Sequence, residues 1–122
     1  MPQTEVVLFS EDDDSVPLLE WLDRQPAKVQ EKSIVRLERL REMGHELRRP
    51  EADFLRDGIH ELRFSFQGVQ YRMLYFFFEG RAVVTHGLTK EGKVPDADID
   101  LAVARKKLVA KDPERYTSEW EA

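Results

Sequence analysis

The chain has 122 residues, a length typical of one domain, and its 24 acidic and 19 basic side chains give a formal net charge of −5. It contains no cysteine, which excludes disulfides, thiol nucleophiles and cysteine-ligated metals. The first residues lack the basic segment of a signal peptide, and the longest apolar run is too short to span a bilayer, so we expect a cytoplasmic protein.

The charge is distributed unevenly along the chain. Residues 1–23 contain seven acidic side chains and no Lys or Arg, whereas residues 24–49 contain eight basic side chains against four acidic ones. The overall acidity disfavours nucleic-acid binding, but the basic middle of the chain allows a local cationic surface.

The first half of the chain predicts one strand and two helices. The apolar, β-branched run 4–9 is typical of a strand. Apolar residues at helical spacing then predict a helix up to residue 24 and a second helix from Pro26 to Gly44. We expect the two helices to pack as a hairpin and residues 45–57 to form a loop.

The second half predicts three consecutive strands. They are expected over about 59–66, 69–78 and 81–88. Two dipeptides, Gln67-Gly68 and Glu79-Gly80, separate them and suit two-residue hairpin turns, because glycine accepts a positive φ. The strands are therefore predicted to pair in antiparallel fashion.

The chain closes with a predicted helix and a polar tail. The helix begins at Pro95, with acidic residues near its start and lysines toward its end, as the helix dipole favours. Residues 112–122 are expected to be loosely ordered. Residues 1–122 are thus predicted to form one α+β domain, with an N-terminal helical hairpin packed on a mainly antiparallel sheet of three or four strands and a C-terminal helix.

The register of the first predicted hairpin raises the question of an anion site. If Gln67-Gly68 is a two-residue turn, Arg63 lies opposite Arg72 on one face of the sheet, with Glu61 diagonal to Arg72. Like charges in this position destabilise a sheet by up to roughly 1 kcal/mol. Two converging guanidinium groups suit a phosphate, which accepts both forks of donors. Alternatively, each arginine pairs with a nearby acid, for example Arg72 with Glu61.

His86 and the lysines that follow it are further candidates. A histidine beside cationic groups can act as an acid or a base on a phosphodiester, and the alternative is a core or capping residue. A second two-residue turn would place His86 opposite Met73, on the face away from Arg72. The loop that carries Lys90 and Lys93 could reach over the end of the sheet.

Taken together, these segments resemble the HigB-type, phage-derived branch of the RelE/ParE toxin superfamily. The chain has ELR at residues 61–63, YR-x-LY at 71–75 and HG at 86–87, followed by Lys90 and Lys93. Each motif is short, but the branch shows them in this order and at similar spacing.

The resemblance covers about residues 4–108 and implies the toxin of a type II toxin–antitoxin system. Such toxins are mRNA interferases, metal-independent endoribonucleases that cut mRNA on translating ribosomes when the RNA 2′-OH attacks the neighbouring phosphate. The implied partners are mRNA, the ribosome and a helix-turn-helix antitoxin. No cofactor, metal or membrane is expected.

The resemblance also implies residue roles. It assigns catalysis to four side chains: Arg72, Arg63, His86 and Lys90. It assigns phosphate binding to three: Lys93, Arg63 and Lys90. Arg72 would stabilise the charge that develops on the attacked phosphate, and Glu61 would orient Arg72.

Two alternatives remain open. The ParE branch resembles this fold but inhibits DNA gyrase without cutting RNA. The HigB-type branch typically has two consecutive lysines where this chain has Lys90 followed by Glu91, and that reduction would suit the ParE-like alternative. The other alternative is a catalytically decayed module that only binds its antitoxin, which the acidic net charge and Glu91 would suit.

Overall fold

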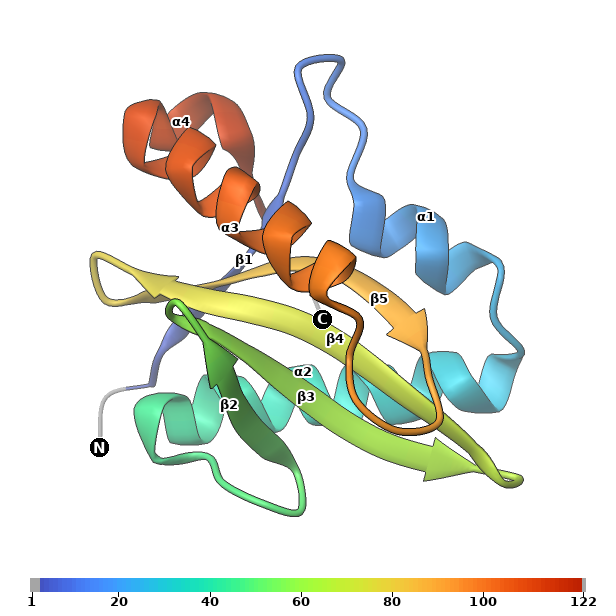
Figure 1. Cartoon of the computed structure of the whole chain (residues 1–122). Helices are drawn as coiled ribbons and strands as arrows, with labels where there is room; N and C mark the ends of the chain where they lie inside the picture. Colours follow the sequence, from blue (N-terminus) through green and yellow to red (C-terminus); the bar gives the residue numbers. More distant parts are fainter. Residues whose placement is uncertain (1–2, 122) are drawn as a thin grey trace.

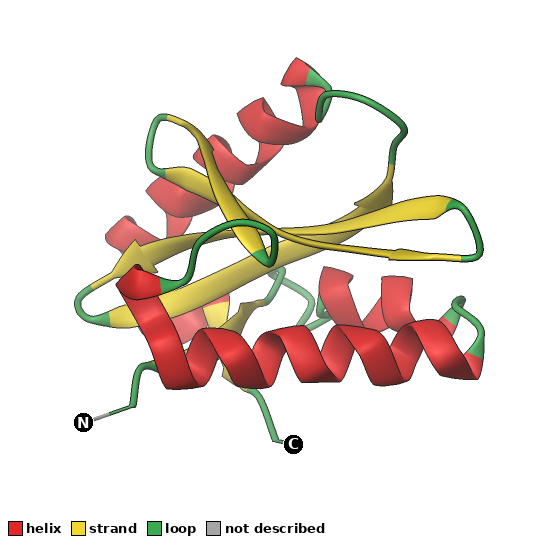
Figure 2. Cartoon of the chain, turned by 90° about the horizontal axis from the view of Figure 1, so that it is seen from below, coloured by secondary structure: helices red, strands yellow, loops and turns green. Residues whose placement is uncertain are grey.

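The structure is a computed structural model that describes residues 3–121. A single sheet lies between helices on both of its faces (Figures 1 and 2). The elements in chain order are β1 Glu5–Phe9, α1 Pro17–Asp23, α2 Ala27–Met43, the 3-10 helix η1 Gly44–Glu46, β2 Ala52–Arg56, β3 Ile59–Phe66, β4 Val69–Phe78, β5 Arg81–Thr89, α3 Asp96–Lys111, α4 Pro113–Tyr116 and β6 Thr117–Glu119. No helix in the described part of the chain has the length and apolarity needed to cross a membrane.

The sheet has six strands in the order β2-β3-β4-β5-β1-β6. All neighbours pair antiparallel except β1 and β5, which are parallel. The predicted α+β class, the mainly antiparallel sheet and the C-terminal helix are confirmed. The predicted number of three or four strands is wrong, because both edges of the sheet carry a strand that the sequence did not reveal.

Those two edge strands come from segments predicted to lack regular structure. Residues 45–57, predicted as a loop, contain the end of η1 and all of β2. The tail, predicted to be loosely ordered, forms α4 and β6 through residue 119, while residue 122 lies outside the described residues. Phe9 anchors the tail, since the Tyr116 ring stacks on the Phe9 ring at 6.0 Å between centroids. The two strands have only five and three residues, which is too short for the apolar alternation that marks a strand in a sequence.

The two predicted hairpin turns are confirmed. Gln67 and Gly68 have φ values of 50° and 79°, and the second turn repeats the pattern, as a two-residue turn with two positive φ angles requires. The turn fixes the register of β3 against β4, so Arg63 lies opposite Arg72 as predicted.

A β-bulge changes the register of β5. Leu74 pairs with His86, where a simple count from the turn gives Met73, because Thr85 is an extra residue in β5. Since strand residues alternate between faces, the extra residue turns His86 toward the face that holds Arg72. The prediction that His86 lies on the opposite face is therefore wrong.

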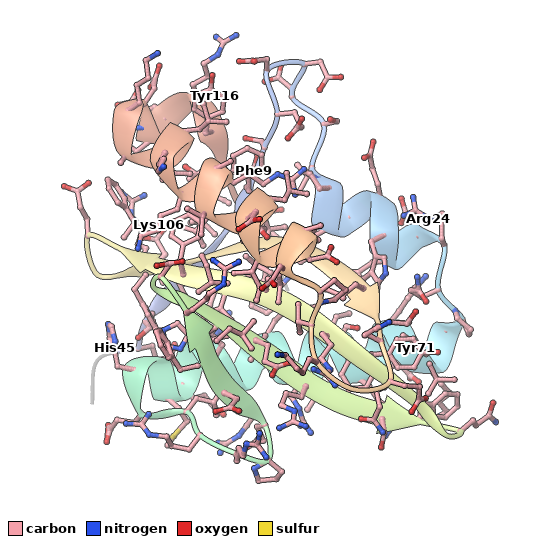
Figure 3. All side chains as sticks on the ribbon, viewed as in Figure 1. Phe9, Arg24, His45, Tyr71, Lys106 and Tyr116 are labelled. Atoms are coloured by element: carbon pink, nitrogen blue, oxygen red, sulfur yellow. The ribbon has the colours of Figure 1, made fainter. Side chains whose placement is uncertain are left out.

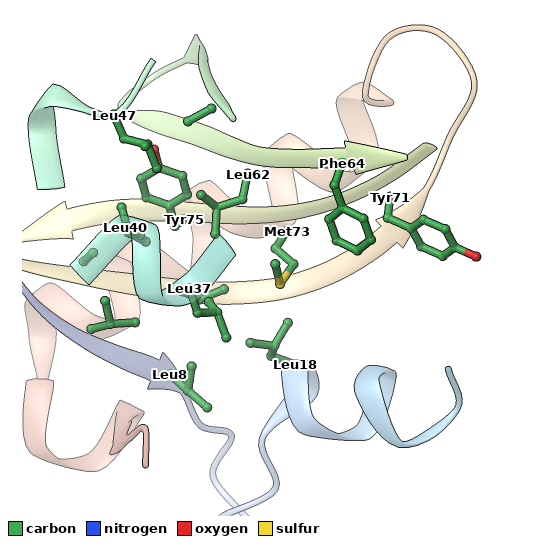
Figure 4. Close-up of a cluster of buried hydrophobic side chains, with 14 of the residues drawn as sticks. Leu8, Leu18, Leu37, Leu40, Leu47, Leu62, Phe64, Tyr71, Met73 and Tyr75 are labelled. Atoms are coloured by element: carbon green, nitrogen blue, oxygen red, sulfur yellow. The ribbon is translucent and has the colours of Figure 1, made fainter. Parts of the chain in front are cut away.

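The face of the sheet under α1 and α2 is a continuous apolar core (Figure 4). Both helices contribute fully buried leucines to it: Leu18, Leu37 and Leu40. However, α1 packs mainly on β5, where a Cβ at Gly87 would overlap the indole of Trp21. The predicted helical hairpin is thus realised as two helices that each pack on the sheet rather than chiefly on one another.

The opposite face is covered by α3 and is less uniform. Its apolar core includes Leu74, Phe76 and Ile99, but Glu61, Arg72 and His86 are also buried on this side. Beyond the start of α3, the loop that joins β5 to α3 lies over β3 and β4, and its Gly92 carbonyl accepts from Arg72 (Figure 1).

Candidate functional site

A cleft of about 490 Å³ opens on the α3 face, beside the loop that joins β5 to α3. Residues from β2, β3, β4, this loop and the start of α3 line it. Its lining includes five basic side chains, Arg49, Arg56, Arg63, Arg72 and Lys93, and three acidic ones, Asp53, Glu61 and Asp96. The cleft therefore collects an excess of positive charge in a protein whose formal net charge is −5.

Arg72 lies at the floor of the cleft and is only 6% exposed. Its Nη1 donates to Oε1 of buried Glu61 at 2.8 Å, and its Nη2 donates to the carbonyl oxygen of Gly92 at 2.7 Å. Within the described residues, its Nε has no hydrogen-bond partner. The structure thus has the ion pair considered above as the alternative, rather than two exposed guanidinium groups that await an anion.

Arg63 lies opposite Arg72 but remains half-buried and unpaired. Its backbone is fixed at both ends, since its N–H donates to the Glu51 carbonyl at 2.9 Å and its carbonyl accepts from Nε of Arg36 at 2.7 Å. Its guanidinium forms no hydrogen bond or ion pair with any residue in the range 3–121. The exposed ammonium of Lys93 likewise has no ion-pair partner among those residues, so these two cations are free to bind a ligand.

The two remaining basic side chains of the cleft, Arg49 and Arg56, form ion pairs with carboxylates. Nη2 of Arg49 lies 2.8 Å from Oδ2 of Asp53, and the hydrogen bond from Arg49 holds the pKa of the Asp53 carboxyl below its usual range. Arg56 contacts three carboxylates, and these hydrogen bonds raise its pKa. These four residues (Arg49, Asp53, Arg56 and Asp96) were not predicted as site residues, and only the basic stretch 24–49 pointed toward any of them.

One end of the cleft is closed by contacts between α3 and the turn that joins β2 to β3. Lys106 of α3 lies beside this turn (Figure 3), where its Nζ donates to the carbonyl of Asp57 at 3.2 Å. Arg56 reaches Oδ1 of Asp100 on α3 at 2.8 Å. These contacts hold β2 against α3 and keep the wall of the cleft in place.

His86 lies outside the cleft, in a polar cluster between β5 and α3. Its Nε2 donates to Oδ1 of Asp98 at 3.1 Å, which makes Nδ1 the acceptor of the Thr85 hydroxyl at 2.6 Å. Burial lowers the pKa of His86, although the hydrogen bond to Asp98 opposes this effect. The structure therefore does not bring His86, the candidate acid or base, close to the other candidate residues. His86 instead links β5 to Asp98 of α3.

Lys90 is also outside the cleft. Its exposed side chain lines a separate shallow hollow with Gln70 and Glu91, and its backbone carbonyl lies 3.4 Å from Nη2 of Arg72. Of the predicted site residues, the cleft thus brings together Arg63, Arg72, Lys93 and Glu61. The roles assigned to them remain predictions.

The fold and the cleft define a small α+β protein with a cationic hollow beside one loop of its sheet. Comparison with known families identifies it further, since the model of the phage derived protein Gp49-like family matches residues 20–107. The chain therefore belongs to the phage-derived Gp49-like family. No curated protein matched the chain.

Proposed function

We propose that the protein is the toxin of a type II toxin–antitoxin pair, of the HigB type within the RelE/ParE superfamily, and that it cleaves mRNA. Membership of a phage-derived family supports this, because the motifs at residues 61–63, 71–75 and 86–87 resemble the phage-derived branch of those toxins. The proposed partners are mRNA on the ribosome and a helix-turn-helix antitoxin.

The observation that carries the proposal is the pair of free cations in the cleft. Arg63 and Lys93 line it without acidic partners among residues 3–121, above the ion pair of Arg72 and Glu61. A phosphodiester carries one negative charge and offers two oxygens to such donors. RNA backbone phosphate is the ligand that this charge and this open shape fit best.

The proposed reaction is an internal transesterification. The RNA 2′-oxygen attacks the adjacent phosphorus, the bond to the 5′-oxygen breaks, and the products carry a 2′,3′-cyclic phosphate and a 5′-hydroxyl. Arg63 and Lys93 hold the phosphate and stabilise its growing charge, while Arg72 adds positive potential from below. The 2′-hydroxyl gives its proton to water, and the 5′-oxygen takes one from water at the open cleft.

The loop over Arg72 determines whether its guanidinium can contact the reacting phosphate directly. The carbonyls of Lys90 and Gly92 occupy Nη2 of Arg72 in this structure. We propose that RNA or its ribosomal carrier displaces the loop, so that Nη2 exchanges these carbonyls for a phosphate oxygen. Glu61 keeps the guanidinium oriented through Nη1 during the exchange.

A second candidate function is a module that binds RNA or antitoxin without cutting. The specific observation in its favour is that Arg72 is locked to Glu61 under the loop while His86 is held away from the cleft. In that case the cleft would bind phosphate but offer no group that accelerates the reaction.

The test is expression of the protein without an antitoxin, followed by mapping of RNA 5′ ends. We expect growth arrest and new 5′-hydroxyl ends within mRNA, and we expect both to vanish in Arg63→Ala but not in the control Lys107→Ala. Intact mRNA in a translating extract would overturn the nuclease. Tight antitoxin binding without cleavage would then favour the binding module, and loss of gyrase supercoiling would favour the ParE-like alternative.

A further inference from the structure

A second hollow, of about 340 Å³, adjoins the cleft and shares Arg49 and Arg63 with it. It lies between α2 and the end of β3, and its other polar lining comes from Arg36, Ser65 and Gln70. Three acidic residues line the cleft, but none of the described residues that line this second hollow is acidic. Any ligand there meets a more uniformly positive surface than in the cleft.

The hollow exists because β2 covers only part of the edge of β3. The ladder between the two strands ends at the pair of Ala52 and Leu62, and one further hydrogen bond joins the Arg63 N–H to the Glu51 carbonyl, so β3 has an open edge beyond Arg63. Arg36 reaches this edge from α2, and its Nε donates to the carbonyl of Arg63 at 2.7 Å. The side chain of Arg36 is thereby held in place at the rim of the hollow.

Arg36 retains donor capacity after these contacts. Its Nη1 lies 3.6 Å from Oε2 of Glu51, and its Nη2 has no hydrogen-bond partner within residues 3–121. Its side chain is 23% exposed, so solvent or a ligand reaches it. The amide of Gln70 and the hydroxyl of Ser65 add neutral donors on the same rim.

We propose, on the basis of the function proposed above, that this hollow binds the RNA phosphate adjacent to the one in the cleft. Because both hollows share Arg49 and Arg63, their two occupants are neighbours on one strand. The RNA then crosses the open edge of β3 and runs from Lys93 toward Arg36 on α2. Arg36 supplies the charge, and Gln70 and Ser65 donate to phosphate oxygens.

The test compares a 2′-O-methyl RNA hexamer with a dinucleotide of the same chemistry, which has a single internal phosphate and no 2′-hydroxyl to react. Binding is followed by fluorescence anisotropy over a range of salt concentrations. In Arg36→Gln we expect about tenfold weaker binding of the hexamer, as loss of one charged phosphate contact entails. The slope of log K against log salt is negative, and it should become less steep by about 0.7, while dinucleotide binding should not change.

Two further variants separate a direct contact from a structural effect. Lys32→Gln removes the same charge one helical turn earlier, at an exposed side chain that does not line the hollow, and should leave the slope unchanged. Gln70→Glu keeps every contact of Arg36 and adds a carboxylate to the hollow. It should weaken binding of the hexamer and spare the dinucleotide.

The possible results distinguish this inference from the function on which it rests. If Arg36→Gln loses affinity equally for the hexamer and the dinucleotide, or loses none for the hexamer, the proposal of a second phosphate site is wrong. The proposed site in the cleft would be unaffected by either result. If Arg63→Ala binds both RNAs as tightly as the wild type does, the proposed phosphate site in the cleft fails, and the inference fails with it.

Discussion

The two faces of the sheet differ in what they bury. Under α1 and α2 the buried cluster consists of aliphatic and aromatic side chains, among them Leu37 and Met73 (Figure 4), and the buried Ser33 hydroxyl of α2 donates to a carbonyl of its own helix. Under α3 the apolar core gives way to buried polar groups, with Arg72 paired to Glu61 and His86 paired to Asp98. Removing a pair of charges from water costs free energy that their mutual attraction largely offsets but does not exceed, so the buried ion pair adds less stability to the α3 face than apolar side chains of the same size would.

The same contrast appears in how each face is covered. Helices seal the α1 and α2 face, whereas the loop from β5 to α3 and the edge strand β2 leave the cleft open on the other. Both faces bury apolar clusters, but the α3 face also presents charged groups in the cleft. Substitutions on the two faces should therefore affect different measurements.

The largest expected effect is loss of one partner of the buried ion pair. Arg72→Ala leaves Glu61 buried without its partner, which should lower the free energy of unfolding by about 3–5 kcal/mol. The double variant Glu61→Leu/Arg72→Met removes both charges and should be nearly as stable as the wild type. Urea denaturation measures both. A stable Arg72→Ala would mean that the pair is not buried as described.

A similar loss should arise on the other face, but without any effect on ligands. Leu37 is fully buried in the apolar core, so Leu37→Ala should cost about 2–5 kcal/mol of unfolding free energy by leaving a cavity. At temperatures where the variant stays folded, its affinity for RNA should equal that of the wild type. A clear loss of affinity in the folded variant would break the separation of the two faces.

Acid should destabilise both faces moderately through their histidines. Burial lowers the pKa of His60, on the α2 side, and of His86, on the α3 side, below the ordinary value of 6.5. As the pH falls through 6.5, the unfolded chain takes up protons that the folded chain binds only at lower pH. The free energy of unfolding should therefore fall as the pH drops from about 7 toward 5.

Denaturation at several pH values measures this slope, and the double variant His60→Gln/His86→Gln should flatten it. His86 also faces Thr85, Asp98 and Arg105, and protonation of its Nδ1 would end the acceptor role of that atom and place a positive charge beside Arg105. Stability that is constant or rises toward pH 5 in the wild type would contradict the burial of the two rings.

The smallest effect on stability is expected at the free cation of the cleft. Arg63 forms no ion pair among residues 3–121 and acts on the Asp53 carboxyl only through a weaker electrostatic attraction, so Arg63→Ala should change the unfolding free energy by no more than about 0.5 kcal/mol. Urea denaturation at neutral pH measures this. A loss of several kcal/mol would show that Arg63 stabilises the fold and is not held ready for a ligand.

The part of the site that local rules govern could be predicted from the sequence. The alternation of β3 and β4 and the turn at Gln67-Gly68 fix the pairing of Arg63 with Arg72, and both are local features. The match to the phage-derived Gp49-like family covers these strands, and it agrees with the phage-derived branch that their motifs resemble.

The rest depends on contacts between distant segments. Arg72 is buried in part because the loop from β5 to α3 covers it, with the Gly92 carbonyl accepting from its Nη2. The alternation of residues along a strand does not predict where such a loop will lie. The bulge at Thr85 turned His86 to the other face, and an inserted residue leaves no mark in the sequence. Asp53 and Arg56 were missed because β2 is an edge strand of only five residues that begins shortly after Pro50, a residue typical of loops.

The most direct test of the central claim, that Arg63 and Lys93 are free to bind phosphate, is an RNA titration of two matched double variants. Arg63→Ala/Lys93→Ala removes both free cations of the cleft, and Lys107→Ala/Lys111→Ala removes two exposed cations of α3 that lie outside it. For uncleavable RNA, we predict that the negative slope of log K against log salt becomes less steep by about 1.4 in the first variant and is unchanged in the control. Equal slopes for both variants would contradict the account.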